Sequence, residues 1–124
     1  MATVLIVEDE PTIRQMVCDI LKASHTCHAV RTAEEGLELL AASAFDVVIS
    51  DVKLPGMDGV QFLRAARATE PALPVILISG GYGYDELTYE EEGAFGYLLK
   101  PFRAEELEEM VARASARRPD MPPA

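Results

Sequence analysis

The sequence has no long apolar run, few basic residues and only two cysteines. A membrane-spanning helix needs about 18 or more apolar residues in succession, and no stretch of this chain comes near that length. Its first residues also lack the basic and then apolar pattern of a secretory signal. Cys18 and Cys27 fit neither a metal-ligand spacing nor a disulfide framework, so we expect two free thiols in a reducing compartment, with a redox pair as the alternative. These shortages favour a cytoplasmic location without membrane contact.

The chain has 21 acidic and 11 basic residues, which gives it a formal net charge of -10. Nucleic-acid backbones attract surfaces rich in lysine and arginine, so this balance argues against direct nucleic-acid binding. With 49% hydrophobic and 26% charged residues, the 124-residue chain has the composition of one globular domain with a single core. We assign this domain to residues 1–118 and a flexible tail to 119–124, because the final stretch, RRPDMPPA, cannot continue a helix.

Short apolar runs alternate with segments of helical periodicity. We predict strands at residues 3–7, 26–30, 45–50, 74–79 and 97–99, the second near a sheet edge because it is more polar. Helices are predicted at residues 11–21 and 102–117. Two more are predicted from capping residues, one beginning after Thr32, which caps it together with Glu35, and one running from Asp58 to about residue 68. Their apolar stripes, expected to face the sheet, include Ile13, Met16, Val17, Leu37, Leu40, Phe62, Leu107 and Val111. This alternation predicts an α/β fold, a doubly wound parallel sheet of five strands in a three-layer sandwich.

Charged and polar residues follow the predicted strands at their carboxyl ends, where parallel sheets bind ligands. They are Glu8, Asp9 and Glu10 after the first strand, Asp51 after the third, Ser79 at the end of the fourth and Lys100 after the fifth. Carboxylates ~4–6 Å apart repel by about 3–4 kcal/mol per pair at an effective dielectric of 20, so the cluster favours a compensating cation. Oxygen ligands suit Mg²⁺, while Lys100 and Ser79 can donate to phosphoryl oxygens. The set matches phosphoryl transfer to an aspartate.

Each of these residues has a plainer explanation when taken alone. An acidic run after a strand commonly forms a solvated helix N-terminus, where negative charge suits the helix dipole. An aspartate such as Asp51 is more often a cap or turn residue, and Lys100 before a proline carries little information. The prediction therefore depends on the combination, in which every group stands at a strand end in the required order.

Four segments in this order, VLIVEDEP, VVISDVKLPGMDG, PVILISGG and GAFGYLLKPF, resemble a response-regulator receiver domain of the chemotaxis-regulator type. The resemblance extends over essentially the whole chain and implies a flavodoxin-like sheet with strand order 2-1-3-4-5. It implies that Asp51 accepts a phosphoryl group from a sensor histidine kinase or a histidine phosphotransfer protein. Lys100 resembles the lysine that pairs with the phosphate, and a downstream protein target would then be bound differently.

The same resemblance implies a metal site. Asp9 and Asp51 would bind Mg²⁺ (or Mn²⁺) directly, together with the backbone carbonyl of Lys53, and Glu8 would act through water. Such a domain catalyses only its own phosphorylation and dephosphorylation, so we classify it as a signalling phosphoacceptor rather than an enzyme.

The resemblance also implies a switch. Ser79 resembles the hydroxyl residue that is drawn to the phosphate, and Tyr97 resembles the aromatic residue that then turns inward. The bond between Lys100 and Pro101 resembles the family's cis peptide, which would aim the lysine at the site.

Residues 80–92 depart from the family's pattern. The segment is rich in glycine and tyrosine and has no basic residue, and Leu87 is the one clear apolar anchor of its expected helix. We therefore expect it to be the most mobile part of the unphosphorylated domain. The alternative is that Tyr82, Tyr84 and Tyr89 pack on the sheet or on a second subunit and hold it still.

Several functions compete for this sequence. We favour a stand-alone signalling receiver, and the alternative is a receiver fragment of a hybrid histidine kinase or a multidomain transcription regulator. A flavodoxin-like electron carrier would need a phosphate cradle where Glu8, Asp9 and Glu10 would repel the flavin phosphate. A small-molecule phosphatase with an aspartate nucleophile usually needs a second acid two residues later, and that position is Lys53.

Overall fold

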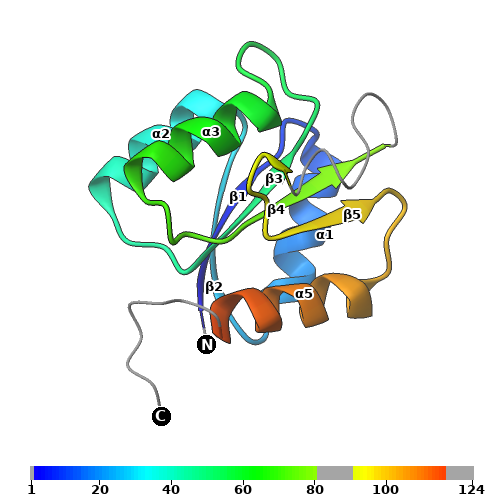
Figure 1. The fold of residues 1–124 in the computed structure, drawn as a ribbon. Coiled ribbons are helices and arrows are strands. Elements are labelled where there is room, and N and C mark those ends of the chain that lie inside the picture. Colours follow the sequence, from blue (N-terminus) through cyan, green and yellow to red (C-terminus); the bar gives the residue numbers. More distant parts are fainter. Residues whose placement is uncertain (1, 81–90, 117–124) are drawn as a thin grey trace.

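The computed structural model describes residues 2–80 and 91–116 and shows strands alternating with helices (Figure 1). The elements are β1 (Thr3–Val7), α1 (Pro11–Leu21), β2 (Thr26–Val30), α2 (Ala33–Ala42), β3 (Val47–Asp51), α3 (Gly59–Thr69), β4 (Val75–Ser79), β5 (Gly96–Leu99) and α5 (Ala104–Ala116). The expected mobility of residues 80–92 concerns a segment that, apart from its ends, lies outside the described residues. The same is true of the three tyrosines at 82, 84 and 89 and of the tail at 119–124.

The five strands form one parallel sheet in the order β2-β1-β3-β4-β5, which confirms the predicted topology. Every residue of β3 and β4 is buried, as expected of central strands covered on both faces. β2 lies at the edge and is largely exposed, so its polar composition predicted its position correctly. The most apolar runs thus form the central strands, where both faces of the sheet are covered and removed from water.

Helices cover both faces of the sheet (Figure 1). α1 and α5 enclose one core, which includes Val17, Leu21, Leu107 and Val111. α2 and α3 enclose the other, in which Phe62 is the largest fully buried side chain. Each fully buried Leu, Ile or Phe contributes about 1.5–3 kcal/mol, so these two layers hold the strand ends in a fixed arrangement.

Local signals explain the starts of two helices, α2 and α3. The Thr32 hydroxyl accepts a hydrogen bond from the Glu35 amide at 3.1 Å, as a helix cap should. Asp58 and Gln61 form a reciprocal capping box at the start of α3. α5 begins at Ala104 and β3 at Val47, two residues later than predicted in each case. Small shifts of this kind are usual because periodicity does not determine where an element starts.

One predicted core residue is wrong. Met16 is 38% exposed on α1, whereas Cys18 packs against the core between that helix and the sheet. Met16 lies at the margin of the apolar stripe of α1, where a long side chain can point toward either the core or the solvent. Cys18 and Cys27 are both free thiols, as predicted. None of the helices within residues 2–80 and 91–116 is long and apolar enough to cross a membrane.

Candidate functional site

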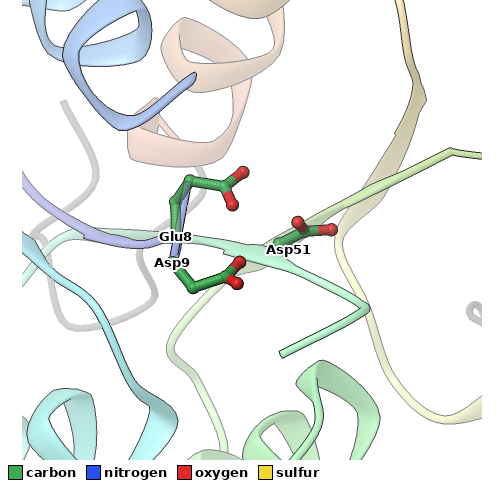
Figure 2. A group of neighbouring side chains, drawn as sticks. All are labelled: Glu8, Asp9 and Asp51. Carbon is green, nitrogen blue, oxygen red and sulfur yellow. The ribbon is translucent and has the colours of Figure 1, made fainter. Parts of the chain in front are cut away.

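Three carboxylates meet at the carboxyl end of the sheet (Figure 2). β1 and β3 are neighbours with Val7 opposite Ser50, so the next residues, Glu8 and Asp51, emerge side by side. One carboxylate oxygen each from Glu8, Asp9 and Asp51 lies within 4.8 Å of the other two. The register of two buried strands therefore produces the acidic cluster that the sequence predicted.

The three carboxylates differ in exposure. Glu8 is 2% exposed and Asp51 is 6% exposed, whereas Asp9 is exposed. Glu8 Oε2 accepts a hydrogen bond from the Glu10 amide at 3.2 Å, but the buried Glu8 Oε1 accepts none. The alternative explanation, a solvated helix N-terminus, thus fits the exposed Asp9 and Glu10 but does not fit the buried Glu8. A buried carboxylate oxygen without a hydrogen-bond donor is costly and is suited to a cation.

Lys100 supplies the positive charge of the site. It follows β5, and its amide donates to the Ser79 carbonyl at 2.7 Å. Its Nζ lies 3.0 Å from Asp51 Oδ2, a hydrogen-bonded ion pair, and 3.5 Å from Glu8 Oε1. The Lys100–Pro101 bond is cis, as the resemblance implies.

The burial and charges of the site shift two pKa values. Burial, reinforced by the charge of Asp51, raises the pKa of Glu8 to about 7, although the Glu10 amide and Lys100 oppose this. Burial alone would lower the pKa of Lys100, but its hydrogen bond to Asp51 and the charges of Glu8 and Asp51 outweigh that effect and raise it. Lys100 is therefore permanently charged near neutral pH, while Glu8 can carry a proton.

A cleft of about 760 Å³ opens over this cluster. Its lining includes four of the predicted site residues besides Lys100, namely Asp9, Asp51, Lys53 and Ser79. Ser79 ends β4 and is 3% exposed. Tyr97 is not among the residues that line the cleft. It stands opposite Leu77 in the β4–β5 pair, two residues before the strand end, and is half-buried against the core.

Two residues that support the site were not predicted. The Gly59 amide donates to the Val52 carbonyl at 2.8 Å, and a Cβ at Gly59 would lie 2.2 Å from the Asp51 carbonyl oxygen. Arg14 of α1 donates through Nη1 to the Glu8 carbonyl at 3.0 Å. The glycine directly after the Asp58 cap could have indicated close backbone packing from the sequence alone. The contact of Arg14 with the Glu8 carbonyl could not, because it depends on how the side chain folds back over the loop.

Two known regulators are similar to this chain in sequence. FleR of Pseudomonas aeruginosa is 45% identical over 115 residues, and NtrC of Escherichia coli is 37% identical over 113 residues. Both matches cover 90% of this chain and 24% of the relative, so the chain spans about a quarter of the length of either regulator.

Two solved structures with the same fold match over nearly their full length. A receiver domain protein of Clostridium thermocellum has a TM-score of 0.89 at 31% identity and covers 94% of this chain and 96% of its own. CheY4 of Vibrio cholerae, a chemotaxis response regulator, has a TM-score of 0.83 at 33% identity and covers 92% and 98%. Residues 4–112 match the model of the response regulator receiver domain. On these matches and its fold, the chain belongs to the response regulator receiver domain family.

Proposed function

We propose that Asp51 accepts a phosphoryl group from a sensor histidine kinase or a histidine phosphotransfer protein, and that the domain passes this signal to a downstream protein target. The observation that carries the proposal is the placement of Asp51. Its carboxylate lines an open cleft, lies within 4.8 Å of the oxygens of Glu8 and Asp9, and is paired with Lys100 at 3.0 Å. A nucleophilic carboxylate, further acids and a fixed cation are the parts that phosphoryl transfer to an aspartate needs.

The acidic cluster fits Mg²⁺ or Mn²⁺. Its donors are carboxylate oxygens, one of which is buried and accepts no hydrogen bond. Asp9 and Asp51, with the backbone carbonyl of Lys53, would hold the ion, and Glu8 would act through water. When bound, the ion supplies positive charge that offsets the repulsion between the carboxylates and the incoming phosphoryl oxygens.

The residues of this chain then have distinct tasks. A carboxylate oxygen of Asp51 forms the new P–O bond as the P–N bond of the donor's phosphohistidine breaks, and the imidazole leaves with that electron pair. Lys100, which already contacts Asp51, pairs with the phosphoryl oxygens that replace the carboxylate charge. The open cleft leaves room for the donor's side chain. The domain itself catalyses only its own phosphorylation and dephosphorylation.

Ser79 and Tyr97 form the proposed switch. Ser79 lines the same cleft as Asp51, and its hydroxyl can donate to a phosphoryl oxygen, a charged hydrogen bond worth about 1.5–3 kcal/mol. Tyr97 lies on the neighbouring strand β5 and turns inward in response. A free-energy difference of that size changes the ratio of the two switch conformations by roughly 10- to 150-fold, which is enough to control the binding of a partner.

We further propose that the protein is a cytoplasmic, stand-alone regulator. Its formal net charge of -10 argues against direct DNA binding by this domain. A second candidate, the receiver of a multidomain transcription regulator, is favoured by the length of FleR and NtrC, of which this chain matches 24%. The length of the protein in its source cell, measured by immunoblot, decides between them.

Labelling with acetyl phosphate tests the chemistry. With Mg²⁺, intact mass spectrometry should find one added phosphoryl group, and Asp51→Asn should abolish it. Asp58→Asn is the matched control, because Asp58 lines the same cleft but caps α3, and asparagine caps equally well. Labelling of the Asp51→Asn protein at the wild-type rate, or labelling that persists after chelation, would overturn the assignment.

A further inference from the structure

Arg14 ties the first turns of α1 to the acidic loop that precedes the helix. Its backbone amide makes the first helical hydrogen bond, to the Glu10 carbonyl at 2.9 Å. Its side chain is half-buried and runs back past that turn, where Nη1 donates to the Glu8 carbonyl at 3.0 Å and to the Asp9 carbonyl at 3.5 Å. One guanidinium nitrogen thus contacts the main chain of two of the three clustered acids.

Few other hydrogen bonds hold the start of α1, the main one running from the Glu10 amide to Glu8 Oε2 at 3.2 Å. Glu10 occupies the N-cap position but makes no side-chain capping hydrogen bond, and Pro11 has no amide hydrogen to donate. On the sheet side, the Glu8 amide donates to the Val30 carbonyl of β2 at 3.1 Å. Arg14 therefore holds the carbonyl groups of Glu8 and Asp9, while the Glu8 amide is held by β2 at the edge of the sheet.

We propose that Arg14 is a positioning residue that holds the Glu8–Asp9 main chain so that both carboxylates face Asp51 for metal binding. The proposal rests on the proposed function, since the bound cation is the one that serves phosphorylation. Arg14 acts on the loop's backbone and needs no contact with the ion itself.

The charge of Arg14 and its hydrogen bonds have opposite effects on cation binding. Removing a positive charge near an acidic cluster should tighten Mg²⁺ binding, because less repulsion opposes the ion. Removing the hydrogen bonds should weaken it, because the free loop must then be ordered when the ion binds. The sign of the change in Mg²⁺ affinity therefore distinguishes positioning from a plain charge effect.

Isothermal titration with Mg²⁺ provides the test. We expect Arg14→Ala to bind Mg²⁺ about three- to tenfold more weakly than wild type, the scale of one to two hydrogen bonds. Lys22→Ala is the matched control, because Lys22 follows the same helix and pairs on the surface with Asp19. It removes an equal charge and should bind Mg²⁺ as tightly as wild type or slightly more tightly. Arg14→Lys, which keeps the charge on a shorter donor, should fall between wild type and Arg14→Ala.

Phosphorylation by acetyl phosphate gives the second readout. Arg14→Ala should be labelled more slowly at low Mg²⁺ and within about twofold of wild type at saturating Mg²⁺, because positioning acts on affinity. Arg14→Ala binding Mg²⁺ as tightly as Lys22→Ala would overturn the positioning role while leaving the proposed function intact. A wild-type protein that binds no Mg²⁺ would instead overturn the proposed function, and circular dichroism confirms that each variant is folded.

Discussion

Lys100 Nζ lies 3.0 Å from Asp51 Oδ2, and this ion pair joins the ends of two strands that are not neighbours. β4 stands between β3 and β5, so the lysine reaches across one strand to the acceptor. The same nitrogen lies 3.5 Å from Glu8 Oε1 and so offsets two buried acids at once. A metal ion or a phosphoryl group bound at the cluster therefore has to fit around the Lys100 ammonium group.

Lys100→Met should destabilise the metal-free domain at neutral pH by about 1–2 kcal/mol. Breaking a buried ion pair costs more than this, but the Lys100 side chain is 21% exposed, so water screens part of the effect. Mg²⁺ should restore most of the lost stability, because it replaces the missing positive charge. Urea unfolding with and without Mg²⁺ measures both quantities. Lys22→Met, which removes an exposed charge directly after α1, should change neither by more than about 0.5 kcal/mol.

Glu8 should make the stability of the metal-free domain fall as the pH rises. Burial raises its pKa to about 7 in the folded state. The folded protein therefore holds a proton that the unfolded chain has released above a pKa of about 4.3. The stabilisation is complete below the unfolded pKa and is lost as the pH rises to about 7, by an amount on the order of 1–3 kcal/mol.

Urea unfolding across this pH range checks the effect of Glu8. Glu8→Gln, which cannot titrate, should flatten the fall, whereas Glu10→Gln on the exposed side of the loop should not. The same pKa predicts that Mg²⁺ affinity rises between pH 6 and 8, since the ion requires the deprotonated carboxylate. An unchanged slope in Glu8→Gln would contradict the assignment of the raised pKa.

Gly59 is expected to tolerate no side chain. A Cβ there would lie 2.2 Å from the Asp51 carbonyl oxygen and 2.7 Å from the Val52 Cα, both backbone atoms that cannot rotate away. Gly59→Ala should therefore destabilise the domain by about 2 kcal/mol or more and slow labelling of Asp51, because the acceptor strand end must shift. Thermal unfolding and acetyl phosphate labelling measure the two effects.

Gly36 provides the contrast to Gly59. A Cβ at Gly36 would meet side-chain atoms of Val7 at 3.0 Å and Phe62 at 3.1 Å, which can move by a few tenths of an ångström. Alanine also favours the helix over glycine by roughly 1 kcal/mol. Gly36→Ala should thus stay within about 1 kcal/mol of wild type and keep normal labelling. Equal losses in both variants would show that backbone proximity is not what matters at Gly59.

The sequence predicted the features that depend on periodicity and strand order. Apolar runs identified the central strands, polarity placed β2 at the edge, and the carboxyl-end rule brought Asp51, Asp9 and Lys100 together. Features that depend on the third dimension were missed. An acidic run does not show that Glu8 alone is buried, and helical spacing does not show that Met16 points outward.

Ser79→Ala should leave Mg²⁺ binding close to wild type, because Ser79 is not one of the clustered acids. It should weaken the structural response to phosphorylation, since the methyl group cannot donate to the phosphoryl oxygens. The amide NMR shifts of β5, including Tyr97 opposite Leu77, report that response. We expect their change on phosphorylation to shrink by at least half in Ser79→Ala and to be kept in Ser79→Thr, which retains the hydroxyl. Identical shift changes in Ser79→Ala and wild type would exclude Ser79 as the link between Asp51 and Tyr97.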